Sequence, residues 1–120
     1  MKKTVLVIDD SRYIRTLIIQ VLINAGYDVV GEAETGEDAI EKVLEFAPDL
    51  IILDTVLPDM LGMDVLGILK EEEVDTKVVM VSAVGQEKVI QESLEAGASS
   101  YIVKPFNNSF LLDKVKKALN

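Results

Sequence analysis

Short runs of aliphatic residues alternate along this chain with longer stretches in which apolar residues recur every three or four positions. The short runs are bounded by turn-forming residues and predict β-strands, whereas the longer period predicts helices with one buried side. The predicted strands cover 4–8, 29–33, 50–53, 77–81 and 101–103, and a helix follows each of them. This alternation predicts one α/β domain over 1–120, a doubly wound parallel sheet covered on both faces.

The predicted helices are expected to turn their apolar stripes toward this sheet. Gly26 and Gly97 are expected to end the first and fourth helices. The stripe residues are Ile14, Leu17, Ile18, Val21, Leu22 and Ala25 in the first helix, Ala39, Ile40, Val43 and Leu44 in the second, Val65, Leu66 and Leu69 in the third, and Phe110, Leu111, Val115, Ala118 and Leu119 in the last. Burial of these stripes would build a core on both faces of the sheet.

Composition narrows the chemistry that the chain can perform. Of its 120 residues 49% are apolar, and the formal net charge is −9. Cysteine and histidine are both absent, which removes disulfides, thiol catalysis, histidine-based triads and histidine-ligated zinc. The acidity disfavours direct nucleic-acid binding, which needs clustered lysine and arginine. No segment is long enough to span a bilayer, and the first apolar run is too short for a secretory signal, so we expect a cytoplasmic protein.

Polar side chains follow four of the five predicted strands. Asp9 and Asp10 come after the first strand, Asp54 after the third, Ser82 after the fourth and Lys104 after the fifth. Parallel strands place their C-terminal ends at one edge of a sheet, which is where open α/β folds bind ligands. These side chains are therefore expected to converge on one site.

Each of these residues also has an ordinary structural explanation. Asp10 and Ser11 are both good helix N-caps, and one of them is expected to cap the first helix. Asp54 with Thr55 fits an acidic turn, and Ser82 alone fits a turn residue. The joint occurrence of polar groups at four strand ends favours a site over these separate explanations.

Three carboxylates in one pocket must be offset by positive charge. Two unit charges about 4 Å apart repel by about 4 kcal/mol at an effective dielectric constant of about 20. Lys104 offsets part of this charge, and a hard divalent cation would offset the rest. An all-oxygen pocket suits Mg²⁺, and Mn²⁺ should also fit, whereas zinc lacks its usual ligands. A carboxylate beside a metal, a hydroxyl and an ammonium is a workable set for phosphoryl transfer to the acid itself.

Five segments carry a resemblance to a known family. They are VIDDS at 7–11, DLIILD at 49–54, LPDMLG at 57–62, VSA at 81–83 and VKPF at 103–106. As a set in this order they are similar to response-regulator receiver domains, and 85–98 resembles the chemotaxis-type members in particular. The resemblance covers essentially the whole chain and implies a flavodoxin-like sheet in strand order 2-1-3-4-5.

The resemblance implies a phosphoacceptor and a metal site. Asp54 would receive a phosphoryl group from a sensor histidine kinase. Asp10 would bind Mg²⁺ directly and Asp9 through water, with Asp54 and the backbone carbonyl of Val56 as further ligands. The chain would then not be a conventional enzyme, because it assists only its own phosphorylation and dephosphorylation.

The resemblance also implies a switch and an output surface. Ser82 would be the switch hydroxyl, Tyr101 the aromatic residue that follows it, and Lys104 the lysine that contacts phosphate. A monomer would bind an output protein through the fourth helix, fifth strand and last helix, with the flagellar motor switch as a candidate partner and no membrane contact. For Tyr101 the alternative is an amphipathic residue at a sheet edge.

Three positions depart from the family pattern. Leu61 stands where members usually have Asp or Asn before the glycine, which bears on the shape of that loop. Val56 and Val84, each two positions past a site residue, flank the path of the hydrolytic water in the family. Neither valine side chain can orient water by hydrogen bonding, so we expect slow self-dephosphorylation.

Rival functions remain open at this point. A phosphorelay intermediate, or a receiver cut from a longer transcriptional regulator, would use the same site. A flavin-binding flavodoxin-like protein would need a neutral, hydroxyl-rich loop after the first strand, where this chain has Asp9 and Asp10. A metal hydrolase would need a general base separate from the acid cluster, and none is apparent.

Overall fold

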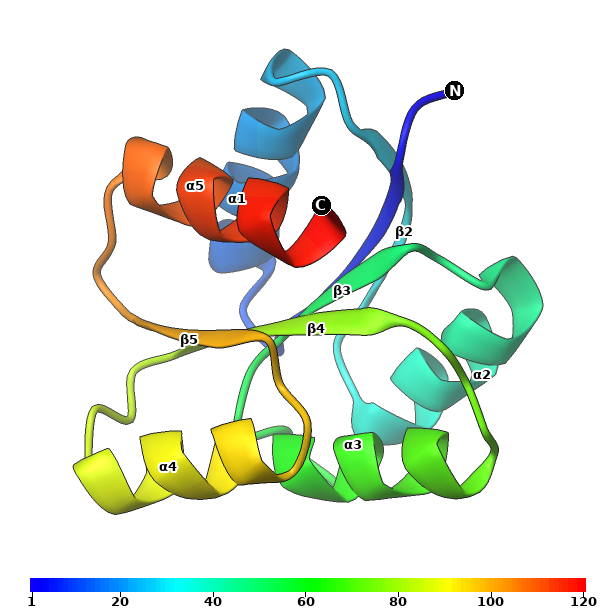
Figure 1. Cartoon of the computed structure of the whole chain (residues 1–120), viewed down its shortest axis with the longest axis vertical. Helices are drawn as coiled ribbons and strands as arrows, with labels where there is room; N and C mark the ends of the chain where they lie inside the picture. The colour runs from blue at the N-terminus through cyan, green and yellow to red at the C-terminus, as the bar shows by residue number, and fades with distance from the viewer.

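The computed structural model describes residues 1–120 and contains five parallel strands alternating with five helices (Figure 1). The elements in chain order are β1 (Thr4–Ile8), α1 (Arg12–Asn24), β2 (Asp28–Ala33), α2 (Gly36–Phe46), β3 (Leu50–Leu53), α3 (Gly62–Glu71), β4 (Lys77–Ser82), α4 (Glu87–Glu95), β5 (Ser100–Val103) and α5 (Asn108–Leu119). The sheet order is β2-β1-β3-β4-β5, which confirms the predicted doubly wound fold.

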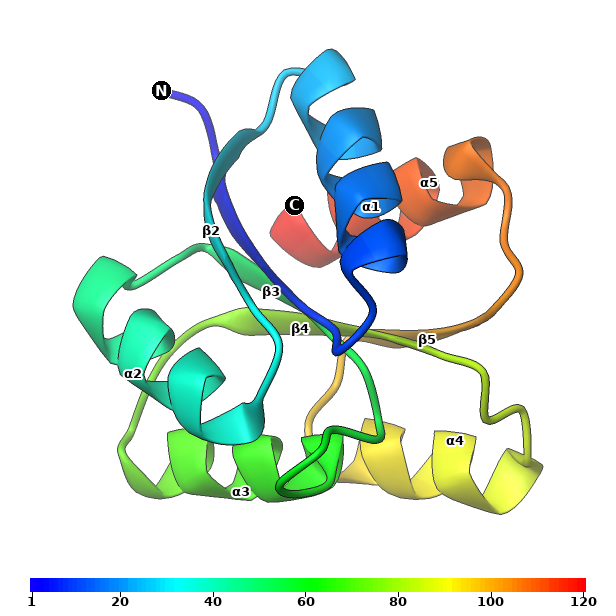
Figure 2. The same ribbon diagram turned by 180° about the vertical axis from the view of Figure 1, so that it is seen from behind.

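The helices cover the sheet in two layers. Figures 1 and 2 show α1 and α5 on one face and α2, α3 and α4 on the other. Alternate residues of each central strand serve the two layers: Leu6 and Ile8 pack with α2 and α3, whereas Val5 and Val7 pack with α1 and α5. Because both faces are buried, the central strands are apolar throughout, as is typical of parallel sheets.

The strand register brings the site residues level with one another. Ile8 of β1 pairs with Leu53 of β3, so that Asp9 and Asp54 follow side by side. Leu53 in turn pairs with Met80 of β4, and two positions further along each chain segment the hydroxyls of Thr55 and Ser82 are in contact. The predicted convergence of strand ends at one edge of the sheet is therefore confirmed.

Some helix positions expected to be buried lie at the surface instead. Leu17 is 42% exposed, Leu44 53% and Phe110 44%, and Ala25 is also exposed, just past the end of α1. The interpretation of these residues as core was wrong because each stripe is wider than the strip of helix that meets the sheet. Only the centre of each stripe is fully buried, at positions such as Ile18 in α1.

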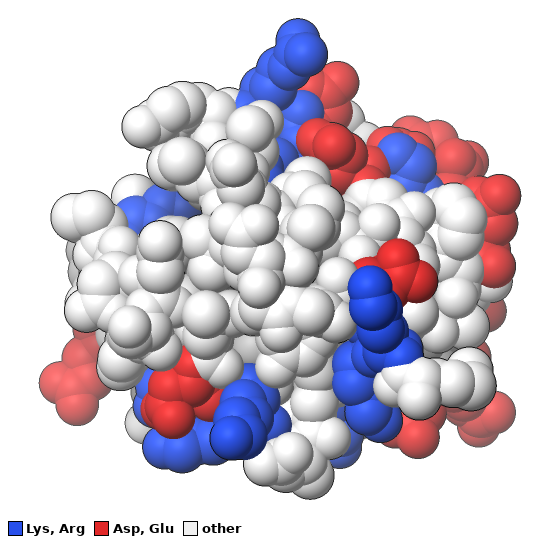
Figure 3. All heavy atoms as spheres, turned by 90° about the horizontal axis from the view of Figure 1, so that it is seen from above, with Lys and Arg blue, Asp and Glu red and all other residues white.

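The surface over α1 and α5 is largely uncharged at its centre, with charged side chains around its margin (Figure 3). Leu17 and Tyr13 of α1 line a groove of about 730 Å³ here, together with Phe106 from the segment before α5. None of the five helices has the length and apolar character that crossing a bilayer requires.

Candidate functional site: an acidic corner at the C-terminal edge of the sheet

The first carboxylates of the site follow β1. Asp9 is buried, and its Oδ1 accepts a hydrogen bond of 2.9 Å from the backbone N–H of Ser11. Ser11 caps α1, its Oγ accepting from the N–H of Ile14 at 3.2 Å. Of the two candidate caps, Ser11 therefore has this role, and Asp10 stays exposed and available to a ligand.

Asp54 lies immediately after β3 and is only 7% exposed. Its Oδ1 accepts from the N–H of Val56 at 3.2 Å, so the predicted acidic turn is present within the site itself. Gly62, the first residue of α3, packs directly behind it: a Cβ at this position would lie 2.3 Å from the backbone oxygen of Asp54. Only glycine allows the start of α3 to approach the acid so closely.

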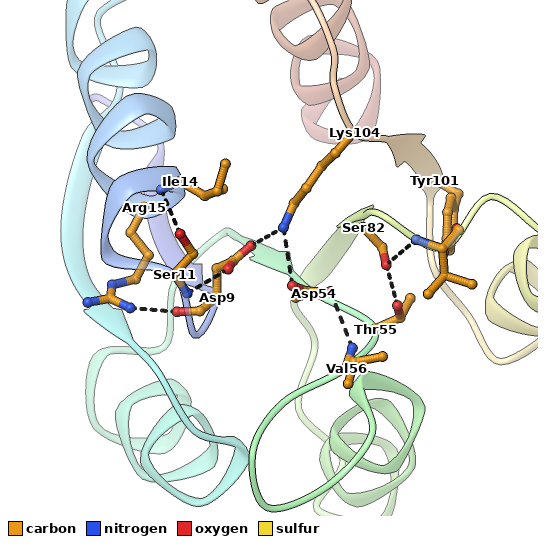
Figure 4. A network of polar contacts seen from close by, with 11 residues as sticks. Asp9, Ser11, Ile14, Arg15, Asp54, Thr55, Val56, Ser82, Tyr101 and Lys104 are labelled. Atoms are coloured by element: carbon orange, nitrogen blue, oxygen red, sulfur yellow. Dashed lines mark hydrogen bonds and ion pairs between the residues drawn. The ribbon is translucent and has the colours of Figure 1, made fainter.

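Lys104 joins the two buried acids (Figure 4). Its Nζ lies 2.6 Å from Oδ2 of Asp9 and 3.2 Å from Oδ2 of Asp54. Burial by itself lowers the pKa of Lys104. The hydrogen bond to Asp9 and the charges of Asp54 and Asp9 outweigh that effect and hold the pKa above its ordinary value of 10.5. Lys104 is therefore a fixed positive charge between the two carboxylates at neutral pH.

Asp9, Asp10 and Asp54 form the acidic trio of the site. Each offers a carboxylate oxygen, and the three oxygens lie within 4.8 Å of one another. Two of the acids are buried and one is exposed, so the trio is reachable from solvent on one side. Hard divalent cations take oxygen ligands of this kind, and Mg²⁺ keeps several of its own waters in such sites. The residues present therefore fit the predicted Mg²⁺, and equally Mn²⁺.

Ser82 lies near Asp54, but its hydroxyl is hydrogen-bonded to Thr55 and Val84 and not to the carboxylate (Figure 4). Its buried Oγ pairs with Oγ1 of Thr55 and accepts from the N–H of Val84 at 3.1 Å. The hydroxyl of Tyr101 donates to the backbone oxygen of Val84 at 2.5 Å. The two residues expected to act as a switch are thus connected through one peptide segment, although their side chains do not bond to each other.

Arg15 is a site-supporting residue that the sequence interpretation missed. It is buried on α1, where its Nη1 donates to the backbone oxygen of Asp9 at 2.6 Å and its Nε to Oε1 of Glu32 at 2.7 Å. It therefore fixes the turn that carries two of the acids. A signal was available, because Arg15 is three residues before Ile18 and seven before Leu22, on the buried stripe itself.

The loop between Asp54 and α3 contains the departures from the family pattern. Val56 and Leu61 form an isolated antiparallel bridge, and both side chains are about half exposed, at 52% and 49%. Leu61 occupies the N-cap of α3 without a side-chain acceptor, and Oδ2 of Asp64 accepts from its N–H at 3.0 Å instead. Val84, next to Ser82 in the site, is half-buried.

The parallel sheet, its strand order and the acidic corner at its C-terminal edge together define a flavodoxin-like α/β protein with a built oxygen-ligand site. Comparison with known proteins gives the family. The model of the response regulator receiver domain matches residues 5–116, and the chain belongs to this family of two-component signalling proteins.

Known relatives share the whole length of the chain. It is 37% identical to the chemotaxis protein CheY of Bacillus subtilis over 120 residues, which is all of both chains. It is 36% identical to CheY of Thermotoga maritima over 98% of each chain. A crystal structure of the CheX–CheY–BeF3–Mg²⁺ complex from Borrelia burgdorferi contains a chain 29% identical to this one with a TM-score of 0.94, covering 98% of this chain and 90% of that one. The protein is CheY-like in sequence and in fold.

Proposed function

We propose that this receiver domain accepts a phosphoryl group on Asp54 from the phosphohistidine of a sensor kinase, in a reaction that depends on Mg²⁺. The observation that carries the proposal is the position of Asp54, a nearly buried carboxylate with Lys104 at 3.2 Å and two further acids at the same sheet edge. The exposed side of the acidic trio gives an incoming phosphohistidine a route to this carboxylate.

The residues of the acidic corner have different roles in the phosphoryl transfer. A carboxylate oxygen of Asp54 attacks phosphorus in line; the new P–O bond forms as the P–N bond breaks, and the electron pair returns to the imidazole nitrogen. Lys104 donates to a phosphoryl oxygen and draws off charge. The acidic trio, with the backbone carbonyl of Val56, would hold Mg²⁺, which would neutralise the remaining negative charge.

Phosphorylation would then change the binding surface. The new phosphoryl oxygens give the Ser82 hydroxyl a strong acceptor that the resting protein lacks. Movement of Ser82 would release the Val84 segment and with it Tyr101, at the edge of the surface made by α4, β5 and α5. We propose this surface as the docking site of an output protein.

Chemotaxis is the proposed setting because the two relatives described above, which match nearly the whole chain, are named as chemotaxis proteins. The output partner would then be a protein of the motility apparatus, with the flagellar motor switch as the candidate. In this role the domain is a signal carrier rather than a conventional enzyme, because the group that it activates ends on its own Asp54. A phosphorelay intermediate would use the same chemistry but would return the phosphoryl group to a second histidine.

The test is direct phosphorylation by a small phosphodonor. Wild type and Asp54→Asn are incubated with acetyl phosphate, with and without Mg²⁺, and the intact masses are measured. A gain of one phosphoryl group is expected only for wild type and only with Mg²⁺. A mass gain that persists in Asp54→Asn would show that another residue is the phosphoacceptor. A mass gain without divalent metal would show that the reaction does not depend on Mg²⁺.

A further inference from the structure

Thr55, the residue after the proposed phosphoacceptor, has a contact that the transfer chemistry does not use. Its side chain is 5% exposed, and its hydroxyl pairs with the hydroxyl of Ser82 (Figure 4). The register of β3 and β4 pairs Leu53 with Met80, and Thr55 and Ser82 each lie two positions further along the chain. The contact joins the strand that ends in the acceptor to the strand that ends in the switch hydroxyl.

The contact with Thr55 bears on the hydrogen bonds that the Ser82 hydroxyl can make. A serine hydroxyl has one donor hydrogen and two acceptor lone pairs. In the structure the N–H of Val84 donates to Ser82, and Thr55 takes up further capacity of the same oxygen. The Ser82 hydroxyl makes no hydrogen bond to Asp54 in the structure and is held by Thr55 and Val84 instead. We therefore expect the Ser82 side chain to turn away from Thr55 in order to donate to a phosphoryl oxygen on Asp54.

Turning of Ser82 leaves the Thr55 hydroxyl without the one side-chain partner it has in the structure. A buried hydroxyl that loses its hydrogen-bond partner destabilises the conformation in which this happens. The resting arrangement is therefore favoured by the presence of a hydroxyl at position 55, and the switched arrangement is disfavoured by the same group.

We propose that Thr55 is a positioning residue that acts through Ser82: it holds the switch hydroxyl in its resting place and so sets how much phosphorylation is needed to switch the domain. The effect extends to the output surface through Val84, because its N–H donates to Ser82 and its carbonyl oxygen accepts from the hydroxyl of Tyr101. This inference rests on the proposed function, since it concerns the response of the same site.

The test compares Thr55→Val, which keeps the branched shape and removes the hydroxyl, with Thr55→Ser, which keeps the hydroxyl. Beryllofluoride with Mg²⁺ serves as the probe for an acyl phosphate, and amide signals at Val84 and Tyr101 report the switched state by NMR. Thr55→Val should reach half-saturation at about tenfold lower beryllofluoride, the equivalent of one lost hydrogen bond. Thr55→Ser should behave as wild type.

The same pair of variants in a Ser82→Ala background provides the control. There Thr55→Val should have no effect on half-saturation, because the contact that it removes is already gone. An unchanged or higher half-saturation for Thr55→Val would overturn the inference, as would an effect that persists in Ser82→Ala. Thr55→Ala gives the same readout if valine disturbs folding. Wild type that binds no beryllofluoride at all would instead count against the proposed function.

Discussion

Two glycines of the same helix should respond in opposite ways to the same substitution. Gly62 begins α3, and a Cβ there would lie 2.3 Å from the backbone oxygen of Asp54 and 3.0 Å from Cα of Thr55. Both atoms belong to the backbone, so neither can swing aside as the end of a flexible side chain could. Gly67, in the exposed middle of α3, has nothing within 4 Å of its Cβ position.

The magnitudes follow from these surroundings. Gly62→Ala must push α3 away from the loop or distort the 2.8 Å hydrogen bond from the Gly62 N–H to the backbone oxygen of Thr55. Overpacking of this kind lowers the free energy of unfolding by about 1–3 kcal/mol. Gly67→Ala meets no obstacle and should raise the free energy of unfolding by about 0.5–1 kcal/mol, because alanine is the better helix former.

Urea denaturation of the two variants and wild type measures both effects. The midpoints should move in opposite directions with similar slopes, because each variant changes stability rather than the surface exposed on unfolding. Gly62→Ala should also accept phosphate more slowly, since its Cβ displaces the backbone of Asp54. Stabilisation by both substitutions, or a Gly62→Ala variant indistinguishable from wild type, would refute the close-approach argument.

Four further predictions concern the surroundings of the site. Arg15→Met should lower the free energy of unfolding by about 1.5–3 kcal/mol and weaken Mg²⁺ binding measured by calorimetry, because a buried charged donor to Asp9 is lost. Glu32→Gln should lower the free energy of unfolding by less than about 1 kcal/mol, since Glu32 is half exposed. Equal losses in the two variants would contradict this prediction. Leu61→Asn should gain about 1 kcal/mol by supplying the missing N-cap acceptor of α3, with Leu61→Ala as the control that gains nothing from capping. Val56→Asn should shorten the lifetime of the phosphorylated form followed by mass, and an unchanged lifetime would speak against a role for the valine. Hydrogen bonds from the N–H groups of Gly36 and Glu37 hold the pKa of Asp59 below its ordinary value of 3.8. The stabilisation from the ionised Asp59 is therefore present above pH 3.8 and is lost as the pH falls through the lower pKa of the folded protein. Asp59→Asn should flatten the acid side of a stability–pH curve, and a curve parallel to that of wild type would exclude this contribution.

The apolar periodicity and the polar residues at the strand ends predicted most of the architecture. The alternation of β-branched runs with helical stripes predicted all ten elements, and the strand boundaries agree to within a residue or two. The gathering of Asp9, Asp54 and Lys104 was also predictable, because parallel strands with covered faces leave only their C-terminal edge for such side chains.

The expectations that were wrong concern how far burial extends around a helix. Leu17, Leu44 and Phe110 continue the apolar periodicity, yet each lies at the margin of its stripe and reaches solvent. Arg15 shows the converse, a charged residue buried at the centre of a stripe because Glu32 and the Asp9 carbonyl satisfy it. Periodicity specifies the direction of a helix face, whereas the width of the contact depends on the neighbours packed against it.

The amino-acid sequence by itself determined the order of the strands and helices, the apolar faces that they bury and the polar residues that end four strands. The tertiary structure decided which of those polar groups touch. Three contacts depend on the register and the side-chain rotamers of different segments of the chain. They are the ion pairs of Lys104 with Asp9 and Asp54, the hydrogen bond from Arg15 to Asp9, and the contact of Thr55 with Ser82. Hydrogen bonds are made or lost over a few tenths of an ångström, and only the packed fold fixes positions that closely.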